Sequence, residues 1–128
     1  MKRFFSLALL LAGIVACSNA PEIALTKNDN GKTITAAPNQ SITLTLDSNA
    51  TTGYKWNLTG EPNAQIVKFV SSNYNAPQNT GGLVGVGGTE TWKFQAIGAG
   101  TTTLKLAYFR PFDPKDVGGE FTLTVTVK

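Results

Sequence analysis

Apolar and polar residues alternate along most of the chain beyond residue 22. The alternation is clearest where Ile42, Leu44 and Leu46 are interleaved with threonines, and it recurs from Phe121 to Val127. A period of two is that of a strand with one buried face. The pattern, interrupted by turn residues, predicts strands at 23–26, 33–36, 41–46, 54–58, 65–71, 90–96, 101–109 and 120–127. No stretch of the chain has a convincing helical period.

These strands predict an all-β fold. Seven or eight short strands fit a two-sheet β-sandwich of immunoglobulin-like type, which takes about a hundred residues and gathers its loops at its two ends. Trp56 is expected to fill a core position without the disulfide that usually lies against it, because the chain has a single cysteine. A small closed barrel is the alternative architecture.

Two connections are longer than neighbouring strands require. Residues 73–88 are rich in glycine, and residues 110–119 contain Pro111, Pro114 and a glycine pair. Both are predicted to be long loops, and long loops in a small domain usually carry function. A shorter connection at 49–54 contains Gly53 and is predicted to be a tight loop that leads into a half-buried strand.

The first residues are predicted to be a signal peptide. Two basic residues precede an apolar run at 4–15 that is too short to span a bilayer comfortably. Residues 14–17 read Ile-Val-Ala-Cys and resemble the lipobox of bacterial lipoproteins, which implies cleavage before Cys17 and lipidation of that residue. An ordinary signal peptide, cut at a nearby small residue such as Ala20, is the alternative.

This interpretation divides the chain into a signal peptide at 1–16, a lipidated tether at 17–22 and an immunoglobulin-like β-domain at 23–128. We expect a lipid anchor in a bacterial cell envelope. Ser18 favours the outer membrane, where the domain is expected on either the periplasmic or the surface side. A lipidated Cys17 leaves no cysteine for a disulfide. Loss of two basic leader residues lowers the formal net charge from +3 to about +1, so the charge gives no reason to expect nucleic acid as a partner.

The residue types exclude most catalytic chemistry. The chain has no histidine, which removes imidazole-activated nucleophiles and nearly all zinc sites. Acidic residues in or near the predicted loops could form a two-carboxylate glycosidase site only in a deep cleft, which a small sandwich does not offer. The glycine run at 81–88 lacks the strand-to-helix context of a phosphate-binding loop. We therefore expect a binding protein, a monomer without metal or cofactor, rather than an enzyme.

Three short motifs carry more specific information. Residues 49–54 read Asn-Ala-Thr-Thr-Gly-Tyr, residues 85–88 read Gly-Val-Gly-Gly and residues 110–112 read Arg-Pro-Phe. In this order and at this spacing they resemble the three signature loops of the chagasin family of cysteine-protease inhibitors, over essentially the whole mature domain. The resemblance implies an immunoglobulin-like sandwich whose loops form a wedge that enters the active-site cleft of papain-like peptidases.

The resemblance also implies a role for each loop. Thr51 and Thr52 would lie over the catalytic pair of the target, with Gly53 permitting close backbone approach. The glycine motif would line one wall of the cleft through main-chain pairing, and the third motif would pack on the other wall. The implied peptidase-binding residues are Asn49, Ala50, Thr51, Thr52, Gly53, Tyr54, Gly85, Val86, Gly87, Gly88, Arg110, Pro111 and Phe112.

Two residues depart from the family's usual motifs. Ala50 stands where proline is common, so the first loop is expected to lose more conformational freedom on binding. Phe112 stands where tryptophan is commoner and offers less area and no indole donor. The alternative function is a lipid-anchored adhesion or polysaccharide-binding module, which predicts exposed aromatics on a flat strand face. A structural envelope lipoprotein is a third interpretation.

Overall fold

The computed structural model describes residues 20–78, 81 and 87–128. Eight strands make up most of this part: β1 (Ile23–Thr26), β2 (Thr33–Ala36), β3 (Ser41–Ser48), β4 (Lys55–Gly60), β5 (Val67–Asn75), β6 (Gly88–Ala96), β7 (Gly100–Arg110) and β8 (Asp113–Val127). The helical elements of the described residues are two single 3-10 turns, η1 (Lys27–Asp29) and η2 (Ala50–Thr52). No described helix is long and apolar enough to cross a membrane.

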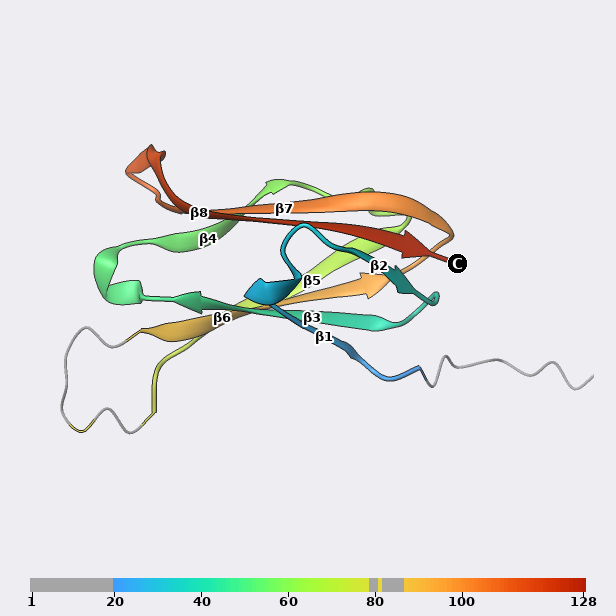
Figure 1. Ribbon diagram of the computed structural model, residues 1–128, viewed down its shortest axis with the longest axis horizontal. Coiled ribbons are helices and arrows are strands. Elements are labelled where there is room, and N and C mark those ends of the chain that lie inside the picture. The colour runs from blue at the N-terminus through green and yellow to red at the C-terminus, as the bar shows by residue number, and fades with distance from the viewer. Residues whose placement is uncertain (1–19, 79–80, 82–86) are drawn as a thin grey trace, which may run out of the picture.

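The strands form two four-stranded sheets that face each other as two layers (Figure 1). One sheet has the order β1-β3-β6-β5 and the other the order β2-β8-β7-β4. The short strands β1 and β2 pair in parallel with β3 and β8, and the remaining pairs are antiparallel. The predicted all-β, immunoglobulin-like two-sheet sandwich is confirmed, and the closed-barrel alternative is wrong because each sheet ends in open edge strands.

The core lies between the sheets and follows the alternation seen in the sequence. On β3 the three aliphatic residues of the alternating stretch are buried, while the threonines between them are half-buried. Trp56 is 8% exposed, which confirms its predicted core position, and its ring packs on that of Tyr108 with the centroids 5.1 Å apart. Burial of one strand face from each sheet is the main stabilising contribution in a domain of this kind.

The predicted long loop at 110–119 is wrong. Strands β7 and β8 continue as a ribbon in which Tyr108 pairs with Gly119 and Arg110 pairs with Asp113, so the turn between them is only two residues long. Because β2 pairs only with the last residues of β8, the first half of β8 has one open edge. Pro114, which has no backbone N–H to donate, lies in a register shift between the pairs Phe109–Val117 and Arg110–Asp113, where it has no partner on β7.

The other predicted loop is shorter than expected. β5 extends to Asn75 and β6 begins at Gly88, so the connection spans 76–87. The extension is held by pairing of Asn75 with Thr89, and the Asn75 side-chain amide donates a hydrogen bond of 2.8 Å to the Thr91 hydroxyl. Side-chain bonds between neighbouring strands therefore continue the sheet into a segment whose composition is typical of loops.

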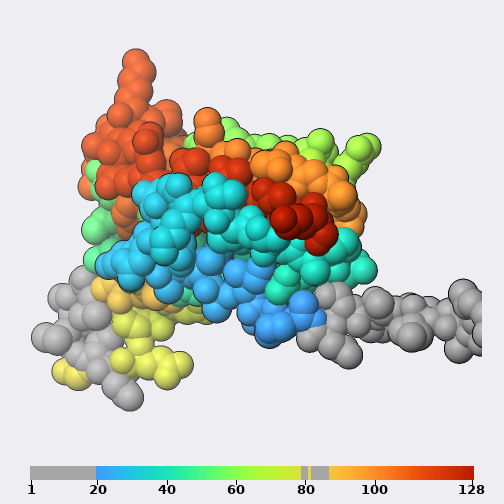
Figure 2. Space-filling model, turned by 45° about the vertical axis from the view of Figure 1, so that its right-hand side comes forward, coloured from blue at the N-terminus to red at the C-terminus, as the bar shows by residue number. Residues whose placement is uncertain are grey.

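One end of the sandwich holds the connection from β3 to β4, the end of β5 and the turn between β7 and β8 (Figure 1). The C-terminus and the start of the described chain lie at the opposite end. There the Pro21 carbonyl accepts a hydrogen bond of 2.7 Å from the Gln40 side chain, in the turn between β2 and β3. The orange-red hairpin of β7 and β8 projects from the body of the molecule (Figure 2).

Candidate functional site

The first loop, residues 49–54, is a preformed 3-10 turn. Asn49 caps η2: its side-chain oxygen accepts hydrogen bonds from the Thr51 N–H (3.1 Å) and the Thr51 hydroxyl (2.6 Å). The Thr52 hydroxyl donates to the Asn49 carbonyl (2.7 Å), and Gly53 closes the turn in the left-handed conformation at φ 80°. Polar side chains that bond their own backbone replace longer-range packing here. The loop is therefore ordered while Ala50, Thr51 and Thr52 remain exposed.

Aromatic rings support the base of this loop. The Tyr108 hydroxyl accepts a hydrogen bond of 2.9 Å from the Asn49 N–H. The Tyr108 ring stacks on Tyr54, with centroids 5.2 Å apart, and it also contacts the core residue Trp56. The first loop is thus connected to the core through three aromatic side chains.

The hairpin tip, residues 110–112, is joined to the first loop by Arg110. Its Nε donates a hydrogen bond of 3.0 Å to the Thr52 carbonyl, and its guanidinium lies 4.5 Å from the Tyr54 ring centroid. Phe112 is 79% exposed, yet one edge of its ring would lie 3.7 Å from a Cβ added at Gly53. The structure therefore brings the first and third sequence motifs together as one surface.

Asp116 adds a second link between these elements, and sequence reasoning missed it. Its carboxylate accepts a hydrogen bond from the Tyr54 hydroxyl. This bond, with a smaller contribution from burial, raises the pKa of Tyr54 above its usual value of 10.0. The two residues are 62 positions apart, and no local pattern joins them.

Only part of the glycine motif can be placed, because Gly85 and Val86 lie outside the described residues. Gly87 is exposed, and a Cβ added there would lie 3.6 Å from the Asn49 Cβ, so this residue adjoins the first loop. Gly88 is the first residue of β6, where an added Cβ would lie 2.1 Å from the Asn75 carbonyl oxygen. Glycine is therefore required at this position because the neighbouring strand leaves no room for a side chain.

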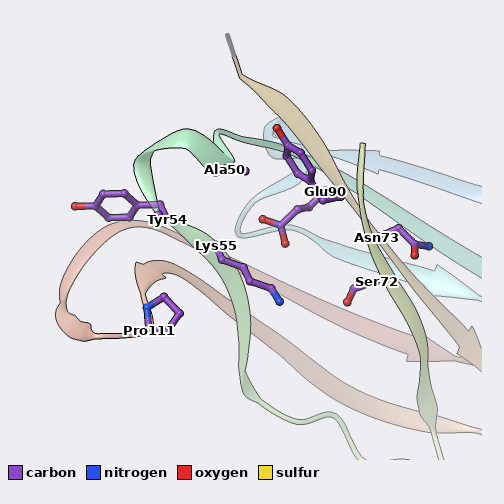
Figure 3. Close-up of a pocket in the computed structure, with 9 residues that line it drawn as sticks. Ala50, Tyr54, Lys55, Ser72, Asn73, Glu90 and Pro111 are labelled. Atoms are coloured by element: carbon purple, nitrogen blue, oxygen red, sulfur yellow. The ribbon is translucent and has the colours of Figure 1, made fainter. Parts of the chain in front are cut away.

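A hollow of about 340 Å³ lies beside the first loop, between the edge strands β4 and β5 (Figure 3). Its lining includes Ala50, Tyr54, Lys55, Ser72, Glu90 and Pro111. Glu90 is 4% exposed, and its carboxylate accepts hydrogen bonds from the Ser48 hydroxyl (2.7 Å) and the Trp56 N–H (3.0 Å). Sequence reasoning missed Glu90 as well, since it falls at an inward position of an otherwise ordinary strand.

No group of described residues could hold a metal ion. Cys17, the predicted lipidation site, lies outside the described residues. The surface assembled at this end of the sandwich is thus made of an exposed turn, an exposed aromatic and an arginine, which suits binding to another protein.

Comparison with known proteins decides the family. Residues 35–127 match the family described as chagasin family peptidase inhibitor I42. The chain belongs to the chagasin family. It is 36% identical to chagasin of Trypanosoma cruzi over 92 residues, which cover 69% of this chain and 81% of the relative. It is 33% identical to amoebiasin-1 of Entamoeba histolytica over 107 residues, which cover 83% of this chain and all of the relative.

A solved structure of this chagasin-family fold is also similar. The crystal structure of a cysteine protease inhibitor from Entamoeba histolytica matches with a TM-score of 0.71 at 27% identity, and the match covers 84% of this chain and 99% of the other. The family recognised from the three motifs is therefore confirmed. Members of the chagasin family are peptidase inhibitors, which confirms that the chain is an inhibitor rather than an enzyme. The binding role of each individual loop residue stays a prediction.

Proposed function

We propose that this chain is a reversible, non-covalent inhibitor of papain-like cysteine peptidases and that the loop end of the sandwich occludes the active-site cleft. The observation that carries the proposal is the first loop, whose exposed Thr51-Thr52 turn is bonded to the hairpin by the hydrogen bond from Arg110 to the Thr52 carbonyl. Similarity to cysteine protease inhibitors supports the same target class. The adhesion or polysaccharide-binding alternative is not favoured.

The first loop is unsuited to act as a substrate. Attack by a thiolate needs an accessible carbonyl carbon whose oxygen can enter a pocket of hydrogen-bond donors. Here the Asn49 carbonyl accepts from Thr52, the Ala50 carbonyl accepts from the Gly53 N–H (3.2 Å), and the Thr52 carbonyl accepts from Arg110. Three carbonyls of this tight turn are therefore already engaged, which disfavours attack on them by the thiolate.

The ordering of the loop before binding favours affinity. Internal hydrogen bonds to Asn49 and the aromatic support of Tyr54 fix the backbone in the free protein. Less conformational entropy is then lost when the complex forms. Phe112 supplies the large exposed side chain that such an interface needs as an anchor on one wall of the cleft.

An inhibition assay tests the proposal. The soluble domain, residues 18–128, should inhibit papain competitively and reversibly, and prior binding should protect the catalytic cysteine of papain from alkylation. Phe69→Ala is the control variant and should inhibit as wild type does. Phe69 is a partly exposed aromatic (40%) on β5 that belongs to neither the first loop nor the hairpin tip. Absence of inhibition of papain and of cathepsins, or inhibition that substrate cannot compete away, would contradict the proposed function.

We also propose that Cys17 is lipidated and holds the domain at a bacterial envelope membrane. The support comes from the sequence of residues 14–17 and from the start of the described chain at residue 20, which lies at the end of the sandwich opposite to the loops. An anchor there would leave the loop end directed away from the lipid surface. Cys17→Ala should move the folded domain from the membrane to the soluble fraction without changing inhibition. Wild-type protein that is already soluble and incorporates no labelled acyl chain would refute the anchor.

A further inference from the structure

Three polar residues are buried in the described part of the chain: Ser48, Glu90 and Thr102. Two of them contact each other, since the Ser48 hydroxyl donates to the Glu90 carboxylate over 2.7 Å. The same carboxylate oxygen accepts from the Trp56 backbone N–H over 3.0 Å. Two of the three buried polar side chains are therefore gathered at one point.

That point lies where the inhibitory loops begin. Ser48 is the last residue of β3, directly before the first loop, and Trp56 is the second residue of β4, two positions after the loop ends. Glu90 is the third residue of β6, so it follows the second connection, residues 76–87. Because β3 and β6 belong to one sheet and β4 to the other, one carboxylate joins both sheets and both ends of the first loop.

A second bond crosses between the sheets beside it. The Trp56 indole Nε1 donates to the Asp47 carbonyl over 2.9 Å, so β4 is bonded to the end of β3 directly, and a second time indirectly through Glu90. Figure 3 shows the Glu90 side chain extending toward the segment that carries Tyr54 and Lys55. The stems of the first loop are thus held at a fixed separation at the place where the chain leaves the sandwich.

The carboxylate is costly in its own right. A buried charge is unfavourable unless hydrogen bonds or an opposite charge compensate it. The ion pairs of the described residues, Lys27 with Asp47 and Lys32 with Asp29, do not include Glu90. Its compensation comes from Ser48 and Trp56, the two residues that flank the loop. A leucine would fill this inward position without a buried charge, but would leave both donors without an acceptor.

We propose that Glu90 is a positioning residue for inhibition: through Ser48 and Trp56 it fixes both ends of the first loop relative to the start of β6. The predicted effect on peptidase binding rests on the proposed function. The predicted effect on the order of the first loop does not, because it can be measured in the free protein. Gln at this position keeps an acceptor oxygen for both donors, whereas Leu keeps none.

The binding experiment compares Glu90→Gln with Glu90→Leu against papain, at a temperature where both variants are folded. Glu90→Leu should bind about tenfold weaker or worse, the size expected when a hydrogen-bonded charged acceptor is removed, and Glu90→Gln should stay within about threefold of wild type. Thr102→Val is the matched control: the Thr102 hydroxyl oxygen accepts from the Asn63 N–H (2.8 Å) in the connection between β4 and β5, at the far end of the sandwich. It should lower stability and leave binding unchanged.

A second measurement needs no peptidase. Amide hydrogen exchange at Thr51, Thr52 and Gly53, each of which donates a hydrogen bond within the loop, should accelerate in Glu90→Leu and not in Thr102→Val. If the chain bound no peptidase, the proposed function would fail while this exchange result could still support the positioning role. Should Glu90→Leu prove unfolded, Ser48→Ala removes one of the two bonds and should accelerate the same amides. Unchanged exchange and binding in folded Glu90→Leu, or a Glu90→Gln variant as weak as Glu90→Leu, would overturn the inference.

Discussion

Phe112 is the residue whose exposure most needs a functional explanation. It is the most exposed of the large apolar side chains in the described residues, at 79%, and it sits at the tip of the hairpin beside Gly53. Although the Phe112 ring lies against the first loop, little of its surface is buried in the free protein. Contact with a partner is what would bury it.

Substitution of Phe112 tests this explanation. Phe112→Ala should weaken binding to papain by roughly 1 to 3 kcal/mol, about ten- to a hundred-fold, and should leave thermal stability almost unchanged because the ring is exposed. Phe112→Trp adds area and an indole donor and should bind as well as or better than wild type. Inhibition constants and melting curves measure the two effects. Weaker binding by the tryptophan variant would mean that this ring faces a different surface.

The hydrogen bond between Tyr54 and Asp116 makes a prediction about titration. Since the neutral phenol donates to the carboxylate, the folded-state pKa of Tyr54 is raised above its usual value of 10.0. The bond therefore stabilises the fold below pH of about 10 and is lost as the pH rises through the folded-state pKa. Tyrosine-selective NMR should show Tyr54 titrating later than a free tyrosine and earlier in Asp116→Asn than in wild type. Titration of wild-type Tyr54 at or below 10.0 would contradict the contact.

At the scale of elements, η2 explains how the first loop tolerates Ala50. The sequence predicted a looser loop here because proline is usual at this place in the family. The structure puts Ala50 at the first position of the 3-10 turn, after Asn49 in an extended conformation (φ −117°, ψ 97°). Proline is favoured at a first helical position and requires an extended residue before it. The site is therefore already shaped for proline.

Ala50→Pro should stabilise the domain by about 0.4–1 kcal/mol, by restricting the unfolded chain, and should tighten binding through the same restriction of the loop. The Ala50 carbonyl, which accepts from Gly53, is retained in proline. Gly53→Ala is the opposing variant: its φ of 80° disfavours any side chain, so it should lose both stability and affinity. Chemical denaturation and inhibition constants give the two readouts. Destabilisation by Ala50→Pro would show that the fold depends on the Ala50 N–H or on a φ that proline cannot adopt.

The elements also show which features the sequence could reveal. All eight predicted strands occur. On β3 and in the second half of β8, burial of one face leaves an alternation that can be read locally. The extension of β8 back to Asp113 could not be read in this way, since prolines and glycines mark loops unless a partner strand such as β7 is known. Glu90 and Asp116 were missed for a similar reason: their partners Trp56 and Tyr54 are 34 and 62 positions away.

At the scale of the whole molecule, the sandwich separates stability from recognition. The aliphatic and aromatic core lies between the sheets, while the first loop and the hairpin tip depend on it through Tyr108 and Trp56. The strand ends that carry these loops are antiparallel neighbours, so their relative positions follow from sheet register. An exposed residue of this surface such as Phe112 can therefore be changed for a different target with little effect on the fold.

The mechanism of the whole inhibitor is tested by a peptidase without its nucleophile. If the wedge only occludes the cleft, it needs no bond to the catalytic sulfur, because Thr51 and Thr52 are poor electrophiles and three of the loop carbonyls are already hydrogen-bonded. Papain with its catalytic cysteine changed to alanine should then bind within about tenfold of active papain, or about 1.4 kcal/mol. Inhibitor recovered after long incubation with active enzyme should be intact between Asn49 and Tyr54, as mass spectrometry can show. Cleavage in that stretch, or inhibition that becomes irreversible with time, would mean that the first loop enters the cleft as a substrate does.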